Sequence, residues 1–318
     1  MKALVPFNNL INYEGYKKSG AGEFYIGFYD PQWHRVFGDF ADLNRLTGYK
    51  ESANANTFEE VLAIIKVVKQ DNLAIYVTFN SSIYSEEQLI FMERYMEPLY
   101  EAGADGIIVS CPELIEVAKK YHLNAVISTI AGVYNKDIAN YYRKLGAARI
   151  ILPRDLSMED IEQIATGIPD MEYEVFMMRN GCIYSDSQCL GLHRNEKSAI
   201  CAALRDAACS LTNLKGDFQS WHDLELNHMV YQKNFHSFAC GLCSIYRFVR
   251  MGITAGKIVG RTDNYEEVCE DIRLICENVA IARSCSSEKE YLEKMQFPTK
   301  TTIMCKMGMN CYYPEVRF

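Results

Sequence analysis

Short apolar runs, rich in β-branched and aromatic residues, alternate along this chain with longer segments of helical periodicity. Nearly every position within a run is apolar, which is typical of a strand covered on both faces of its sheet. The predicted strands lie at residues 3–7, 23–29, 73–80, 105–110, 124–129, 148–153, 173–178 and 256–260. The predicted helices lie between most of them, at residues 57–70, 85–103, 112–121, 135–146, 157–167 and 264–282.

This alternation indicates a parallel sheet, because parallel neighbours are joined by a crossover that usually contains a helix. The count of strands favours a closed (β/α)8 TIM-type barrel over an open α/β sheet. Ser85 and Ser157 can begin helices, since a serine hydroxyl accepts a hydrogen bond from an unpaired backbone N–H. Gly103 and Gly146 can end helices. We therefore expect an α/β fold of the TIM-barrel type.

The interval between the last two predicted strands is much longer than one crossover helix requires. In a TIM-type barrel, the loops after the carboxyl ends of the strands carry the catalytic and binding groups. We therefore predict that residues 1–283 form a barrel domain and that its long cysteine-rich insertion, residues 179–250, carries the functional site. Residues 284–318 are predicted to be a C-terminal tail that packs on the barrel.

The composition narrows the class of protein. The chain has 318 residues, is 49% hydrophobic and carries a formal charge of −8. This charge argues against a nucleic-acid partner, because general nucleic-acid binders present a basic face. No apolar run is long enough for a membrane span, and the first residues are too poor in apolar positions for a signal peptide. We therefore expect a cytoplasmic protein, in a compartment where thiols stay reduced.

The chain contains twelve cysteines, and half of them fall in the insertion. In a reducing compartment, so many thiols serve either as apolar core residues or as metal ligands. Cys182 and Cys189 lie in a polar segment without helical or strand periodicity, so packing in a core explains them poorly. Cys201 and Cys240 follow in the same insertion. Four thiolates can hold a [4Fe–4S] cluster, one at each iron, so these four are candidate ligands, with loosely placed core or surface cysteines as the alternative.

Other assignments of the cysteines stay open. A structural zinc also accepts four thiolates, usually with ligand pairs two to four residues apart. Cys240 and Cys243 have this spacing, and Cys209 or Cys243 could replace one of the predicted ligands. Cys305 and Cys311 form either a second small metal or redox site or a turn that docks the tail.

Polar side chains stand at the ends of several predicted strands. Because the carboxyl ends of all barrel strands face one side, we expect these side chains on one rim. There, Arg154, Lys257 and Arg261 could form a cationic pocket for a carboxylate ligand, since the arginine fork matches two oxygens. A surface or ion-pair role is the alternative for each residue. The predicted substrate-binding residues are Asn80, Ser128, Thr129, Arg154, Lys257 and Arg261.

Four stretches, residues 103–135, 145–161, 174–189 and 252–268, resemble the peptidase U32 family, first named collagenase-like peptidases. The resemblance continues in order over nearly the whole chain. It implies a TIM-type barrel with an oxygen-sensitive [4Fe–4S] cluster on four cysteines, arranged similarly to Cys182, Cys189, Cys201 and Cys240. Where many members carry His-Gly, this chain has Met178 and Arg179.

The resemblance also implies a reaction. Several branches are implicated in hydroxylation without O2, on ubiquinone precursors or on RNA bases, with prephenate as the expected oxygen source in the RNA branches. A short chain of one barrel is similar to the quinone branches. We therefore expect redox chemistry on a small organic substrate, with a carboxylate as oxygen donor. The alternatives are a U32 peptidase and a non-catalytic partner of a homologous U32 barrel.

Overall fold

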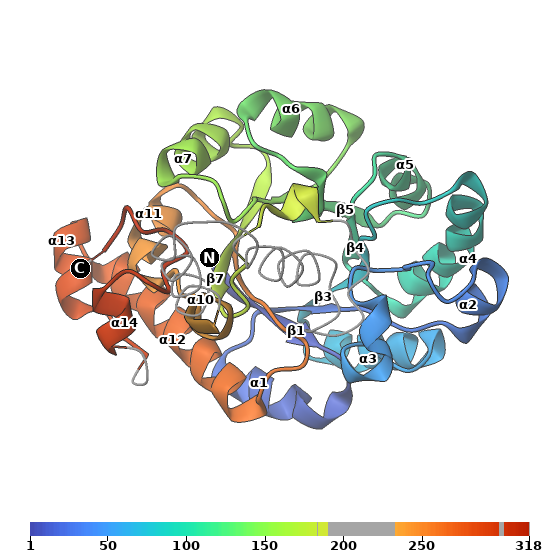
Figure 1. Ribbon diagram of the computed structural model, residues 1–318, viewed down its shortest axis with the longest axis horizontal. Helices are drawn as coiled ribbons and strands as arrows, with labels where there is room; N and C mark the ends of the chain where they lie inside the picture. The colour runs from blue at the N-terminus through green and yellow to red at the C-terminus, as the bar shows by residue number, and fades with distance from the viewer. Residues whose placement is uncertain (183, 190–232, 299–301, 318) are drawn as a thin grey trace, which may run out of the picture.

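The computed structural model describes residues 1–182, 184–189, 233–298 and 302–317. Within these ranges, eight parallel strands close into a barrel in chain order, and β8 pairs with β1. Helices form a ring around the strands (Figure 1). This architecture confirms the predicted (β/α)8 TIM barrel. The strands are β1 (Lys2–Phe7), β2 (Glu23–Ile26), β3 (Ala74–Phe79), β4 (Gly106–Val109), β5 (Asn124–Ile127), β6 (Arg149–Ile151), β7 (Glu172–Met178) and β8 (Ala255–Ile258).

Each predicted helix is present, and the structure adds shorter ones. The helices are α1 (Tyr13–Ser19), α2 (Pro31–Phe37), α3 (Phe58–Gln70), α4 (Glu86–Ala102), α5 (Glu113–Lys120), α6 (Lys136–Leu145), α7 (Met158–Gly167), α10 (Lys233–Phe238), α11 (Ile245–Arg250), α12 (Tyr265–Ser284), α13 (Glu288–Lys294) and α14 (Thr302–Lys306). Short 3-10 turns include η2 (Thr47–Ser52), η3 (Thr129–Ala131), η4 (Asp186–Gln188) and η7 (Leu242–Ser244). Among the helices of these ranges, none combines the length and the apolar character that a bilayer crossing needs.

The predicted helix boundaries are confirmed by their capping contacts. The hydroxyls of Ser85 and Ser157 each accept a hydrogen bond from the backbone N–H three residues on, and the side chain there bonds back to the cap, which makes two capping boxes. Gly103 and Gly146 end α4 and α6 with φ of 91° and 103°. In that left-handed region a residue with a Cβ is strained, so the glycines fix where the helices stop.

The barrel interior contains ion pairs between its strands. Arg149 on β6 reaches the buried Glu23 carboxylate of β2 at 2.5 Å. Lys257 on β8 binds the carboxylate of Glu174 on β7 at 2.8 Å, and its ammonium lies 3.9 Å from the centre of the Tyr25 ring. Because every buried charge needs a partner, these contacts between strands help to fix their register.

In the C-terminal tail, α13 and α14 lie beyond α11 and α12, on the outer side of the ring of helices (Figure 1). The Tyr291 hydroxyl donates to the carbonyl of Leu242 at 2.5 Å. The Tyr313 hydroxyl donates to the carbonyl of Phe176 on β7 at 3.0 Å. The end of the chain is thereby attached to the strand that leads into the cysteine-rich insertion.

Candidate functional site

A buried carboxylate is the centre of the polar cluster at the barrel mouth. Asp186 begins η4, on the loop after β7, and is 1% exposed. It accepts hydrogen bonds from Arg154 at 2.7 Å (Nε) and 3.1 Å (Nη2). Arg45 Nη1 donates to the same carboxylate at 2.9 Å, and the Thr129 hydroxyl donates at 3.1 Å. Elements far apart in the chain therefore meet at one side chain.

The charges of this cluster stabilise one another. Burial alone would raise the pKa of the Asp186 carboxyl, but Arg154 and Arg45 outweigh it and hold that pKa well below its usual range. Burial alone would lower the pKa of the Arg154 guanidinium, but Asp186 raises it. The Arg154 guanidinium also lies 4.2 Å from the centre of the Phe176 ring. Two cations and one anion leave an excess of positive charge at this point.

Four of the predicted binding residues belong to this cluster. The Asn80 side-chain oxygen accepts from the backbone N–H of Arg45 at 3.2 Å, and its amide donates to the Ser128 hydroxyl at 3.4 Å. Thr129 and Arg154 contact the central carboxylate as described above. The expected rim is thus built at the ends of β3, β5 and β6. The role of these residues in binding a substrate remains a prediction.

Arg261 follows β8 and is a buried cation, 8% exposed. It donates to the side-chain oxygens of Asn54 at 2.9 Å and Asn44 at 3.1 Å. Among the residues that the structure describes, no carboxylate lies within ion-pair distance of it. Burial lowers the pKa of Arg261 to about 10, against a smaller opposite effect of Tyr25. A Cβ on Gly27 would lie 2.0 Å from Arg261 Nη1, so this glycine leaves the space that the guanidinium fills.

Lys257 lies deeper than the rim. Its side chain points into the barrel and is paired with Glu174, as described above. Burial lowers the pKa of Lys257, and Glu174 acts in the opposite direction. The structure therefore places Arg154 and Arg261 at the mouth, but Lys257 below them in the interior.

Two of the predicted cluster ligands flank the buried carboxylate. Cys182 and Cys189 stand on either side of Asp186 in the chain, and both are partly buried. Burial raises the pKa of the Cys182 thiol, while Arg154 and Arg45 act to lower it. The charge of Cys189 acts to raise the pKa of Arg45. Guanidinium groups this close would favour the thiolate form that binds metals.

The third described ligand candidate, Cys240, lies after α10. It is buried, and burial raises the pKa of its thiol well above the usual value. The Tyr312 hydroxyl lies within electrostatic reach of both Cys182 and Cys240. The Tyr312 ring stacks against Phe176, with ring centres 5.9 Å apart. Cys201, the fourth predicted ligand, lies outside the described residues, as does Cys209, which could replace one of the four.

The donor set fits an iron–sulfur cluster in its chemistry. Within the described ranges, no three metal-ligating side chains lie close enough to hold a single metal ion. A four-iron cluster accepts each thiolate at a different iron, so its ligands need not converge on one point. A cluster bound by four thiolates is also an anion. The guanidiniums of the half-buried Arg45 and of the buried Arg154 and Arg261 exceed the one carboxylate among them and would offset that charge.

The loop that carries Cys182 begins with two residues in an unfavourable backbone conformation. Arg179 and Asn180 have φ of 62° and 45°, in the left-handed region that favours glycine. The Arg179 carbonyl accepts from the Tyr312 hydroxyl at 2.5 Å, and the Asn180 carbonyl accepts from Arg154 Nη1 at 2.8 Å. These contacts hold the strained turn and so set the direction in which Cys182 leaves the barrel.

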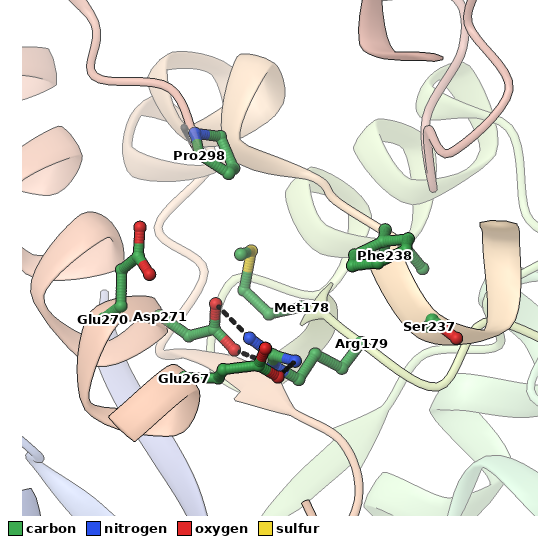
Figure 2. A pocket seen from close by; sticks show the side chains of 9 residues that line it. Met178, Arg179, Ser237, Phe238, Glu267, Glu270, Asp271 and Pro298 are labelled. Carbon is green, nitrogen blue, oxygen red and sulfur yellow. Dashed lines mark hydrogen bonds and ion pairs between the residues drawn. The ribbon is translucent and has the colours of Figure 1, made fainter. Parts of the chain in front are cut away.

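The Arg179 side chain is tied to α12. Its guanidinium binds Glu267 at 2.6 Å and also pairs with Asp271 (Figure 2). Burial raises the pKa of Asp271 to about 7, although Arg179 opposes this. Met178 and Arg179 line the small pocket shown in Figure 2. Arg179 stands where many U32 members carry glycine, and its positive φ is the backbone conformation that glycine prefers. In this chain, the ion pairs with Glu267 and Asp271 stabilise an arginine in that conformation.

Sequence reasoning missed several residues of this site. They are Asn44, Arg45, Asn54, Asp186 and Tyr312. One signal was present, because Asp186 is an acidic residue between two candidate ligands. The others lie in segments without periodicity, where nothing in the sequence indicates that they turn toward the barrel mouth.

Fold and site together define a TIM-barrel protein with a thiol-bearing loop and buried arginines at its mouth. The family model described as Peptidase family U32 matches residues 19–299. The chain therefore belongs to peptidase family U32, which confirms the resemblance seen in the sequence.

Curated relatives carry two kinds of name. The chain is 32% identical over 117 residues to tRNA hydroxylation protein P of Escherichia coli, covering 36% of this chain and 26% of the relative. It is 25% identical over 262 residues to tRNA hydroxylation protein P1 of Bacillus subtilis, covering 78% of this chain and 60% of the relative. It is 23% identical over 249 residues to Collagenase of Porphyromonas gingivalis, covering 74% and 58%. The chain thus spans between about a quarter and three fifths of the length of these relatives.

A solved structure, that of the U32 peptidase Mk0906, is 18% identical with a TM-score of 0.44, covering 56% of this chain and 69% of that chain.

Proposed function

We propose that this U32 protein holds a [4Fe–4S] cluster on Cys182, Cys189, Cys201 and Cys240 and takes part in a hydroxylation that does not use O2. The observation that carries the proposal is the pair Cys182 and Cys189 beside the Arg45–Asp186–Arg154 cluster at the barrel mouth. The relatives named tRNA hydroxylation proteins support the type of reaction. When bound, such a cluster supplies electron transfer.

The loop between the first two ligands has a positioning role in this proposal. Asp186 fastens the loop to Arg154 and Arg45, which extend from two other parts of the barrel. The same two guanidiniums lower the energetic cost of placing thiolates in a half-buried site. Three ion-paired hydrogen bonds thereby hold both cysteines toward the mouth.

Arg261 is the residue best suited to bind a carboxylate oxygen donor. The guanidinium is buried, its pKa is lowered by burial, and its described partners are the neutral amides of Asn44 and Asn54. A buried cation with neutral partners gains stability when a carboxylate binds. Arg154 is already paired with Asp186, and Lys257 with Glu174, so both have less to gain.

The acceptor is proposed from the relatives. Their names direct the first test to a base of tRNA. A small organic substrate is the alternative acceptor, because the chain is acidic.

The test removes the gene from its host, grows the cells without O2, and analyses nucleosides of total tRNA by mass spectrometry. We expect one hydroxylated nucleoside to disappear, wild-type protein to restore it, and Cys182→Ser to fail. Cys111→Ser is the matched control, because Cys111 follows β4 and is no predicted ligand. Unchanged nucleosides together with the loss of a hydroxylated small molecule would assign the small substrate. No change in either pool would contradict the proposed hydroxylation.

Peptide hydrolysis is the alternative function, because the Porphyromonas gingivalis relative is named Collagenase. If iron-free protein cleaves peptides in air, and substitution of the cysteines at the barrel mouth does not abolish this cleavage, the peptidase function is favoured over hydroxylation.

A further inference from the structure

The tail brings a second thiol beside a predicted cluster ligand. The backbone N–H of Cys240 donates to the carbonyl of Asn310 at 2.7 Å, and the N–H of Tyr312 donates to the carbonyl of Cys240 at 2.9 Å. These two bonds make Cys240 and Cys311 directly opposed partners in a parallel bridge. Opposed residues of neighbouring parallel strands lie about 4.8 Å apart at their Cα atoms and extend their side chains to the same face.

This separation is within the range that a disulfide requires, about 4.4–6.8 Å between Cα atoms. Both thiols are free in this structure. Cys243 and Cys305 also lie within electrostatic reach of Cys240, but neither pairs with its backbone. The backbone therefore selects Cys311 as the partner of Cys240.

The tail segment is held in this register by further contacts. The Asn310 side-chain amide donates to the carbonyl of Phe238 at 3.0 Å, just before Cys240. The Tyr312 and Tyr313 hydroxyls donate to backbone carbonyls of the β7 end, at 2.5 Å and 3.0 Å. Residues on both sides of Cys311 are thus anchored, which keeps its thiol opposite Cys240.

We propose that Cys240 and Cys311 form a dithiol that a disulfide oxidant converts into an intramolecular disulfide. One cysteine thiolate attacks the oxidant, forms a mixed disulfide and releases one thiol. The other cysteine then displaces the second thiol and closes the Cys240–Cys311 bond. Two electrons and two protons pass from the protein to the oxidant, which leaves as two thiols.

The disulfide would control the metal site. This consequence rests on the proposed function, in which Cys240 is a cluster ligand. A sulfur bound to Cys311 no longer offers a thiolate to iron, so the disulfide and the cluster exclude each other. Under oxidising conditions, the C-terminal tail would therefore remove one ligand from the cluster site.

The first experiment maps disulfides and needs no cluster. The full chain is freed of iron with a chelator and reduced. It is then incubated with glutathione disulfide, alkylated, digested and analysed by mass spectrometry. We expect one bond per chain, between Cys240 and Cys311. Cys311→Ser should leave Cys240 alkylated, whereas Cys305→Ser, the matched control in the same tail, should leave the bond intact. Complete alkylation of Cys240 in wild-type protein, or its linkage to another cysteine, would overturn the proposal.

The second experiment measures iron uptake on reconstitution with iron and sulfide. Oxidised wild-type protein should take up less iron than reduced protein, because one of the four ligands is no longer available. Oxidised Cys311→Ser should take up as much as its reduced form. Equal uptake by oxidised and reduced wild-type protein would overturn the link to the cluster. If reduced wild-type protein takes up no iron, the proposed function fails. The disulfide map would still show whether Cys240 and Cys311 form a disulfide.

Discussion

The buried carboxylate of Asp186 gives the sharpest stability prediction. Asp186→Asn keeps the shape of the side chain but removes its charge, so Arg154 and Arg45 lose their anionic partner. Three hydrogen bonds from guanidinium groups end on this carboxylate, at 2.7, 3.1 and 2.9 Å. Such bonds contribute roughly 1.5–3 kcal/mol each, and the amide oxygen of asparagine retains part of them. Breaking a buried pair costs about 3–5 kcal/mol, and we expect the free energy of unfolding to fall by that amount at pH 7.

The assay is urea unfolding of the full chain. Gln188→Ala is the matched control, because Gln188 is exposed in the same η4 turn, and it should change the free energy of unfolding by less than about 0.5 kcal/mol. The pKa of Asp186 is lowered on folding, so its contribution is complete above the ordinary aspartate range and is lost as the pH falls through the folded pKa. The difference between wild type and Asp186→Asn should therefore narrow only in acid. A loss below about 1 kcal/mol at pH 7 would refute the reasoning.

Three further predictions follow from neighbouring residues. The pKa of Asp271 is raised to about 7, so folded protein binds the extra proton and the unfolding free energy should fall as the pH rises from about 4 to 7, by on the order of 1 kcal/mol per unit. Asp271→Asn should remove this slope in urea titrations, and an unchanged slope would contradict the assignment. Arg179→Gly should be more stable than Arg179→Ala by about 1 kcal/mol, because both lose the ion pairs but only glycine relieves the positive φ; equal melting curves would argue against strain. Gly27→Ala places a Cβ against the Arg261 guanidinium and should lower the free energy of unfolding by about 1–3 kcal/mol. An unchanged thermal midpoint would show that the space around this guanidinium is not tightly filled.

Much of the fold could be predicted from the sequence, for a physical reason. Strands buried on both faces are read as continuous apolar runs, and all eight predicted runs are barrel strands. The missed helices α1 and α2 have seven residues each, which is too short for a clear period.

The site could be predicted only in part. Arg154 stands directly after a recognisable strand, so its place on the rim followed from the barrel. Arg45 reaches Asp186 from 141 residues away, along a loop whose sequence has no pattern. Lys257 lies within β8, and its position in the barrel interior could not be predicted. In a strand that is otherwise apolar, the sequence does not indicate which face of the sheet the lysine side chain is on. The pairing of Cys240 with Cys311 depends on tertiary backbone contacts and has no signature in spacing.

The most direct test of the central claim is iron and acid-labile sulfide analysis, with a visible spectrum, after purification without O2. The account predicts about four irons and about four sulfides per chain, with loss of both in Cys182→Ser, Cys189→Ser and Cys240→Ser. Cys111→Ser should retain them. Colourless protein with one zinc per chain, or iron content that none of the three substitutions lowers, would contradict the account.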